Sequence, residues 1–198
     1  MRKTTPPLIL ASTSPFRREL LTRLGLEFET FAPEIDETSR PGEDATSLVE
    51  RLSIRKAKAA RAHFDNALVI GSDQVSINND KILGKPQDHQ QAVEQLRQAS
   101  GQRIRFLTGL CLYNIREDRY QVHVEPFDVV FRKLSTQQIE NYLRAEQPYN
   151  CAGSFKSEGL GITLFESMQG DDPNSLIGLP LIRLTTMLAE EGIEVLSD

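Results

Sequence analysis

The segment Leu8–Arg18 places a short apolar run directly before the predicted start of a helix. Leu8–Ala11 has the composition of a buried strand, Ser14 fits an N-cap, and Pro15 suits the first helical position. Open α/β sheets bind ligands where a strand ends and a helix begins in this way. The free N–H groups and partial positive charge of such a helix N-terminus favour a phosphate, although an ordinary capped amphipathic helix has the same pattern.

Helical and strand patterns alternate along the chain, which favours an α/β fold. The predicted strands are Leu8–Ala11, Glu27–Phe31, Leu68–Ser72, Asp73–Ile77, Lys81–Leu83, Arg103–Tyr113 and Tyr120–Phe131. The predicted helices are Pro15–Leu24, Asp44–His63, Asp88–Ala99, Thr136–Ala145 and Leu181–Glu191. Hairpin turns are expected at Asn78-Asn79-Asp80 and around Asn114–Arg119, and a loop region near a site from Cys151 to Asp172. No repeat or linker divides the sequence, so residues 1–198 are expected to form one domain.

The composition indicates a globular protein that would have to gather its cations locally to bind a phosphate-rich ligand. The 198 residues carry a formal net charge of −5, whereas a general nucleic-acid binder would be basic. The apolar run Leu8–Ala11 is too short for a signal-peptide core, and no later run is long enough to span a bilayer. Cys111 and Cys151 lack metal-like spacing, which is typical of reduced cysteines. We therefore expect a cytoplasmic protein without a nucleic-acid or membrane partner.

Three polar positions are candidates for chemistry. Asp73 follows the apolar run Ala67–Ile70, where an acid can bind a metal or accept a proton from water, although turn-capping aspartates have the same setting. Lys56 shares a predicted half-buried helix face with Leu52, so it needs either an anionic partner or a snorkelling stem. Lys85 stands between a glycine and a proline that restrain its backbone, so its ammonium either reaches a defined phosphate or is simply solvated.

In their order along the chain, the motifs resemble those of the Maf family of nucleoside triphosphate pyrophosphatases, also called septum formation inhibitor proteins. They are Ser-x-Ser-Pro-x-Arg at Ser12–Arg17, Ile-Asp-Glu at Ile35–Glu37, Lys56, Asp73, Gly-Lys-Pro at Gly84–Pro86, Thr108-Gly109, and Glu158-Gly159-Leu160-Gly161. Each motif is weak alone, but their order and spacing are specific and cover nearly the whole chain. The resemblance implies a two-lobed Maf/ITPase-like fold, with a mixed elongated sheet flanked by helices around a central cleft, in a homodimer. It also implies hydrolysis of a nucleoside triphosphate to the monophosphate and pyrophosphate with a divalent metal, Mg²⁺ or Mn²⁺.

The resemblance also implies a role for each matching position. Asp73 corresponds to the proton acceptor and, together with Glu37, to the acids near the metal. The positions implied to handle the triphosphate or contact the substrate are Ser12, Ser14, Arg17, Lys56 and Lys85. Arg18 falls where the family varies and is expected on the helix surface.

Three departures from the family pattern concern the base. Phe16, Gln74 and Glu158 stand where members acting on pyrimidine nucleotides typically have arginine, threonine and glutamine, and this combination resembles the 7-methyl-GTP pyrophosphatase branch. An aromatic face attracts the cationic ring of 7-methylguanine, and a carboxylate can accept two N–H groups from its edge. Otherwise, Phe16 would be a core residue and Glu158 a solvated acid. The expected activity is hydrolysis of 7-methyl-GTP to 7-methyl-GMP and pyrophosphate in nucleotide-pool housekeeping. The alternative is a regulator of cell division that senses a nucleotide without turnover.

Overall fold

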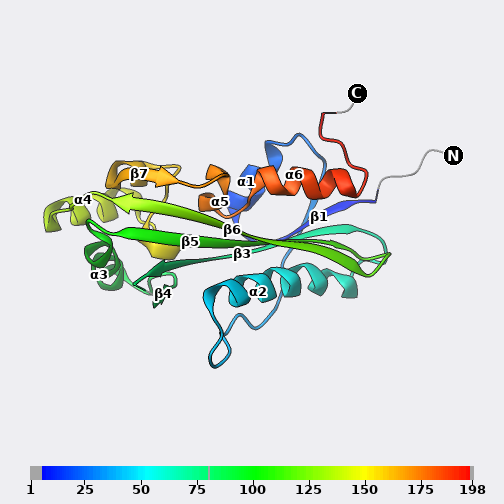
Figure 1. Ribbon diagram of the computed structural model, residues 1–198, viewed down its shortest axis with the longest axis horizontal. Helices are drawn as coiled ribbons and strands as arrows, with labels where there is room; N and C mark the ends of the chain where they lie inside the picture. The colour runs from blue at the N-terminus through cyan, green and yellow to red at the C-terminus, as the bar shows by residue number, and fades with distance from the viewer. Residues whose placement is uncertain (1–5, 80, 197–198) are drawn as a thin grey trace.

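The computed structural model describes residues 6–79 and 81–196, so the basic start of the chain and the turn residue Asp80 lie outside the described part. Within it, one seven-stranded mixed sheet runs the length of the molecule (Figure 1). The strands are β1 (Leu8–Ala11), β2 (Glu29–Phe31), β3 (Leu68–Asn78), β4 (Lys81–Leu83), β5 (Arg103–Asn114), β6 (Arg119–Phe131) and β7 (Phe165–Gln169). The α-helices are α1 (Pro15–Thr22), α2 (Ala45–Ala59), α3 (His89–Ala99), α4 (Thr136–Glu146), α5 (Pro173–Ile177) and α6 (Leu181–Glu190). Short 3-10 helices are η1 (Ala60–Ala62), η2 (Ala152–Ser154) and η3 (Leu160–Leu164).

Helices pack on both faces of this sheet, with α2 on one face and α1 and α6 on the other (Figure 1). Under α1 and α6, leucines such as Leu10, Leu21 and Leu184 are fully buried against β1, β3 and β5. A separate apolar cluster fills the end of the sheet where α3, α4 and β7 lie. This arrangement confirms the predicted α/β class with a mixed sheet flanked by helices.

The strand order leaves a notch along one edge of β3. The sheet order is β2-β1-β3-β5-β6-β7, with β4 paired to β3 off this path. On one edge, β5 pairs with β3 along most of its length. On the other edge, β1 pairs in parallel only as far as Gly71, and β4 pairs from Ser76 onward. The four residues 72–75 are therefore open on that edge, where a ligand can approach the middle of the sheet.

Two glycines bring α2 unusually close to the sheet. A Cβ on Gly71 of β3 or Gly109 of β5 would lie 2.2 Å from a carbonyl oxygen of the helix. Larger residues at these positions would push α2 away from the sheet. Asp73 lies two residues beyond Gly71 and therefore on the same face. The close approach lets Lys56 of α2 reach Asp73.

The observed elements differ from the predicted ones in two places that matter for the site. The predicted strands Leu68–Ser72 and Asp73–Ile77 are one continuous strand, because β5 pairs with it from Leu68 to Ile77. The sequence suggested that Asp73 follows the end of a strand. In the structure Asp73 instead lies in the middle of β3. The predicted loop region from Cys151 to Asp172 contains β7 and two 3-10 helices. The turn after β3 has the expected hairpin pairing of Asn78 with Lys81.

Candidate active site

A cleft of about 680 Å³ opens at the notch along β3. The predicted site residues that line it are Ser12, Ser14, Phe16, Arg17, Glu37, Lys56, Asp73, Gln74 and Lys85. The remaining predicted site residue, Glu158, lines a smaller pocket of about 110 Å³ that shares Phe16, Arg17, Gln74 and Lys85 with the cleft. Residues from opposite ends of the sequence thus meet in two adjoining cavities.

Lys56 is buried between two carboxylates. Its Nζ lies 2.6 Å from Oδ1 of Asp73 and 2.8 Å from Oε1 of Glu37. Lys56 and Asp73 are only 6% and 7% exposed, whereas the side chain of Glu37 is 56% exposed. Burying an ammonium is costly unless opposite charges pair with it. Of the two explanations for this lysine, the structure therefore supports the anionic partner, and Asp73 is an ion-pair partner and not a turn cap.

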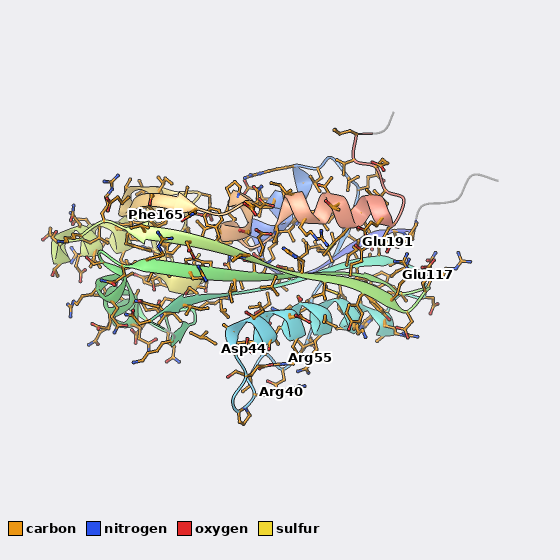
Figure 2. The ribbon with its side chains drawn as sticks, in the orientation of Figure 1. Arg40, Asp44, Arg55, Glu117, Phe165 and Glu191 are labelled. Atoms are coloured by element: carbon orange, nitrogen blue, oxygen red, sulfur yellow. The ribbon has the colours of Figure 1, made fainter. Side chains whose placement is uncertain are left out.

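Glu37 comes from the irregular segment between β2 and α2, which two arginines of α2 tie to the helix. Arg51 donates to Oε1 and Oε2 of Glu43 at 2.5 and 2.7 Å, and these bonds hold the pKa of Glu43 down at about 2. Arg55 donates to the carbonyl oxygen of Asp36 at 3.0 Å, and Figure 2 shows it beside this segment. The bond from Arg55 reaches the residue directly before Glu37. Together these bonds hold the segment so that the carboxylate of Glu37 reaches Lys56.

The start of α1 has the geometry that its sequence predicts. Ser14 is the N-cap, with its Oγ accepting from the backbone N–H of Arg17 at 3.4 Å, and Pro15 occupies the first turn. The Oγ of Ser12 accepts from the backbone N–H of Ser14 at 3.2 Å. The turn from β1 into α1 thus borders the cleft and brings the positive end of a helix to it.

Arg17 is half-buried and fixed by the segment that follows α5. Its Nε donates to the carbonyl oxygen of Gly178 at 2.8 Å, and the same oxygen accepts from Oγ of Ser72 at 2.8 Å. Burial lowers the pKa of the Arg17 guanidinium, an effect opposed by the charges of Asp73 and Glu37. An arginine so placed stays protonated and supplies a fixed positive charge to the cleft.

Phe16 is partly withdrawn from solvent, whereas Glu158 has an exposure that fits both a ligand-facing and a solvated acid. Phe16 is half-buried and lines both cavities, so it is not a core residue. Glu158 is exposed and accepts a hydrogen bond of 3.3 Å from Oγ of Ser157. Cys151 lines the smaller pocket as well, and burial, reinforced by the charge of Glu158, raises the pKa of its thiol to about 11. Its sulfur is therefore uncharged at neutral pH.

The structure adds a positioning segment that the sequence analysis missed. The carbonyl oxygens of Ser175 and Leu176 in α5 accept hydrogen bonds from the side-chain amide of Gln74. The carbonyl oxygen of Gly178, directly after α5, accepts one from Arg17. Asp172 caps α5 and is 2% exposed. The pair Asp172-Pro173 repeats the N-cap and proline signal of α1, so the sequence contained a signal for this short helix.

Other residues that line the larger cleft were also missed, among them Asn150 and Lys156. Lys156 binds Glu146. Its Nζ donates to the carbonyl oxygen of Glu146 at 3.1 Å and lies 3.5 Å from Oε1 of the same residue. Lys156 lies in the region predicted as a loop, Cys151 to Asp172, and Asn150 directly precedes it. No periodicity marks such residues, and no sequence signal would have identified them.

The carboxylates of the cleft fit a metal that is held jointly with a substrate. Glu37 and Asp73 both contact the ammonium of Lys56, so the two carboxylates border the same part of the cleft. Among residues 6–79 and 81–196, no group of three or more His, Cys, Asp or Glu side chains is arranged to hold a metal ion. Mg²⁺ commonly takes one or two carboxylates and completes its shell with phosphate oxygens and water. The donor set of the cleft matches that mode of binding.

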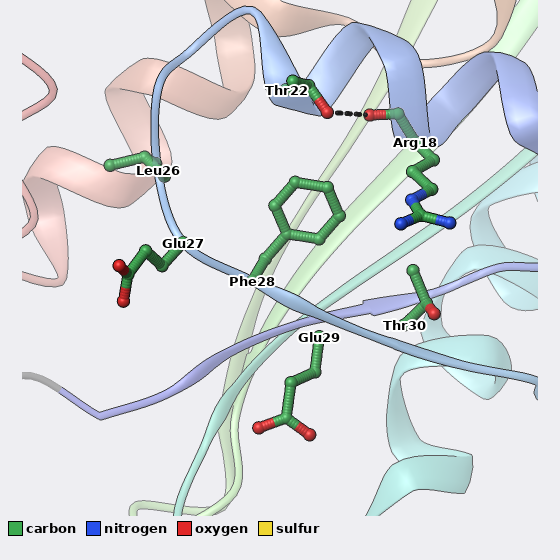
Figure 3. A pocket seen from close by; sticks show the side chains of 7 residues that line it. All are labelled: Arg18, Thr22, Leu26, Glu27, Phe28, Glu29 and Thr30. Atoms are coloured by element: carbon green, nitrogen blue, oxygen red, sulfur yellow. Dashed lines mark hydrogen bonds between the residues drawn. The ribbon is translucent and has the colours of Figure 1, made fainter.

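A third hollow, of about 610 Å³, lies between α1 and β2 and contains no predicted site residue (Figure 3). Arg18 and Thr22 line it from α1, with residues 26–30 on the other side. Thr22 Oγ1 donates to the Arg18 carbonyl at 2.9 Å. The neighbouring residues Arg17 and Arg18 therefore line different cavities.

None of the helices described here is both long and apolar enough to cross a membrane.

The chain is similar to known proteins over nearly its whole length. The family described as Maf-like protein matches residues 7–191. A Nitrosococcus oceani protein named 7-methyl-GTP pyrophosphatase is 59% identical over 191 residues, covering 96% of each chain. A protein of the same name from Pseudomonas aeruginosa is 56% identical over 190 residues, covering 96% of this chain and 99% of its own. The solved structure of a HAM1 protein from Coxiella burnetii matches 93% of this chain and 99% of its own with a TM-score of 0.53 at 13% identity, a likeness of fold alone. With a family match over nearly its whole length and relatives this similar, the chain belongs to the Maf-like protein family.

Proposed function

We propose that this chain is a nucleoside triphosphate pyrophosphatase that hydrolyses 7-methyl-GTP to 7-methyl-GMP and pyrophosphate. The observation that carries the proposal is the pairing of two adjoining cavities. Lys56 and Asp73 line the larger one and Glu158 lines the smaller one, while Phe16, Arg17 and Lys85 line both. Relatives more than half identical to this chain bear the name of that activity.

In this proposal Asp73 acts on water. Its carboxylate orients a water molecule, accepts a proton from it and directs it at the α-phosphorus. The new bond joins the water oxygen to the α-phosphorus, and the bond from that phosphorus to the bridging oxygen of the β-phosphate breaks. Pyrophosphate leaves with the bonding electrons. The bond to Lys56 holds the Asp73 carboxylate in a single orientation during this step.

Arg17, Lys56 and Lys85 meet the triphosphate. Negative charge grows on the leaving pyrophosphate as the bond breaks, so cations fixed beforehand favour the transition state over the bound substrate. Glu37 and Asp73 would hold a divalent cation, Mg²⁺ or Mn²⁺, which supplies further neutralisation of phosphate charge when it is bound. Ser12 and Ser14 at the turn before α1 add hydroxyl and backbone contacts to the substrate.

The base occupies the smaller pocket. Phe16 lies against the face of the methylated ring, where an aromatic attracts a cation. Glu158 accepts from the N–H groups at the edge of guanine, and Gln74 lines the same pocket.

On the family resemblance we also propose that the protein is a homodimer and that it is located in the cytoplasm. Light scattering tests the first proposal, and cell fractionation tests the second.

The deciding experiment is a turnover assay on 7-methyl-GTP, GTP, dTTP and UTP with Mg²⁺ and with Mn²⁺, in which the phosphate product is identified. The expected result is the highest kcat/KM for 7-methyl-GTP and one pyrophosphate for each monophosphate formed. Release of orthophosphate would overturn the proposal. Nucleotide binding without any release of pyrophosphate would favour the sensor of cell division instead.

A further inference from the structure

The side-chain amide of Gln74 is held by a set of acceptors beneath the smaller pocket. Its Nε2 donates to Oγ1 of Thr108 at 3.0 Å and to the carbonyl oxygens of Ser175 and Leu176 at 2.7 and 3.1 Å. Thr108 is fully buried on β5, directly opposite Gln74 in the strand pairing. The amide nitrogen therefore faces the protein.

These partners also decide which way the amide can point. The two carbonyl oxygens can only accept hydrogen bonds. The hydroxyl of Thr108 donates its proton to the carbonyl of Ser175 at 2.9 Å, so toward Gln74 it acts as an acceptor. A flipped amide would place its oxygen against three acceptors and leave buried groups without donors, which is costly. The side-chain nitrogen of Gln74 must therefore face these acceptors, and its side-chain oxygen must point away from α5.

The oxygen of Gln74 is free to meet a ligand. Gln74 lines both cavities, and its Oε1 accepts no hydrogen bond from any residue in the described part of the chain. The smaller pocket thus contains two acceptors, this oxygen and the carboxylate of Glu158. The edge of guanine has three N–H bonds, one on N1 and two on the exocyclic amine, whereas adenine has none at these two positions.

We infer that Thr108 is a positioning residue that, with the carbonyls of α5, locks Gln74 as an acceptor toward the pocket and so makes the enzyme choose guanine over adenine. This inference rests on the proposed function, because it concerns the base of the same substrate. Thr108 touches no substrate and acts through Gln74. An unlocked glutamine would present its amide N–H groups to the base as readily as its oxygen, and the choice between donors and acceptors would weaken.

Replacing the hydroxyl tests the lock. Thr108→Val keeps the shape of the side chain but removes the acceptor for Gln74 and the donor to Ser175, while Thr108→Ser keeps both. The ratio of kcat/KM for 7-methyl-GTP over 7-methyl-ATP should fall about tenfold in Thr108→Val, mainly through the loss on 7-methyl-GTP, and return in Thr108→Ser. The matched control is Thr185→Val on α6, which loses a comparable bond to the Leu181 carbonyl away from either cavity and should keep the ratio. An unchanged ratio in folded Thr108→Val would overturn the inference.

A second measurement needs no variant at Thr108 and no substrate. The side-chain amide signals of Gln74 in the free wild-type protein, identified by their absence in Gln74→Met, should exchange with deuterium far more slowly than those of the exposed Gln90. Exchange as fast as that of Gln90 would show that the amide is not locked. If the wild type does not hydrolyse 7-methyl-GTP, the proposed function fails, and the exchange measurement still decides the lock.

Discussion

Lys56 and Asp73 form a buried ion pair in which 2.6 Å separates Nζ from Oδ1, with the lysine on a helix and the aspartate in the middle of a strand. The pair forms because Gly71 and Gly109 let the helix backbone approach the sheet. Glu37 completes the arrangement from an irregular segment. Stability and chemistry are therefore coupled at this point, because the carboxylate proposed to act on water is also a partner of a buried charge.

Asp73→Asn should lower kcat by about a hundred- to ten-thousand-fold, because it removes the proton acceptor. It should also reduce the free energy of unfolding by about 1–3 kcal/mol, because Lys56 loses one of its two carboxylate partners among the described residues. Both are measured on one preparation, by steady-state assay and by urea unfolding. The control Asp65→Asn changes an exposed aspartate and should alter neither. Near-normal turnover in Asp73→Asn would remove the assigned role.

Glu37→Gln should raise the concentration of Mg²⁺ or Mn²⁺ needed for half-maximal activity, since one of the two converging carboxylates is lost. A shift of about tenfold is expected, which corresponds to about 1.4 kcal/mol of lost metal affinity. The measurement is a metal titration at saturating 7-methyl-GTP. Glu34→Gln in the same segment, exposed and absent from the cleft lining, is the matched control. Identical titration curves for the two variants would place the metal elsewhere.

Arg17→Ala and Lys85→Ala should each lower kcat more than they raise KM, and leave the preference among bases unchanged. Every nucleoside triphosphate shares the phosphates that these cations meet, and the charge they neutralise grows toward the transition state. Arg18→Ala is the neighbouring control on the same helix, since Arg18 lines the hollow in Figure 3 and not the cleft. A sharp change of base preference in Lys85→Ala would instead place that lysine beside the base.

Phe16→Arg, Gln74→Thr and Glu158→Gln together should move preference from 7-methyl-GTP toward pyrimidine triphosphates. Stacking of a cationic ring on Phe16 contributes roughly 0.5–2 kcal/mol and a charged hydrogen bond to Glu158 about 1.5–3 kcal/mol. The measurement is the ratio of kcat/KM for 7-methyl-GTP, GTP and UTP in the single and triple variants. If the triple variant keeps the wild-type ratios, the base does not bind in the smaller pocket.

Cys151 should be alkylated slowly at neutral pH and faster as the pH rises. Burial raises the pKa of its thiol to about 11, so below that pH the reactive thiolate is a small fraction that grows about tenfold for each pH unit. The readout is the rate of iodoacetamide labelling of Cys151 from pH 7 to 10 by mass spectrometry. Cys111, fully buried, should remain unlabelled in the folded protein. A labelling rate at Cys151 that is flat across this range would contradict the raised pKa.

The sequence predicted the turn from β1 into α1 well, because an N-cap and a proline are local signals that do not depend on tertiary contacts. It also marked Lys56, since a lysine on an apolar helix face needs either an anionic partner or a snorkelling stem, and the structure shows the first. The continuity of β3 was missed because the polar Asp73 breaks the apolar pattern, whereas pairing with β5 holds the strand across it. The role of α5 was missed because its backbone carbonyls, and not its side chains, hold Gln74 and Arg17, and backbone contacts leave no trace in residue types.

The most direct test of the account is hydrolysis of 7-methyl-GTP by the wild-type protein in water enriched in oxygen-18, with both products analysed by mass spectrometry. Attack of water on the α-phosphorus, oriented by Asp73, predicts one heavy oxygen in 7-methyl-GMP and none in pyrophosphate. Heavy oxygen in pyrophosphate, or no pyrophosphate at all, would contradict the account.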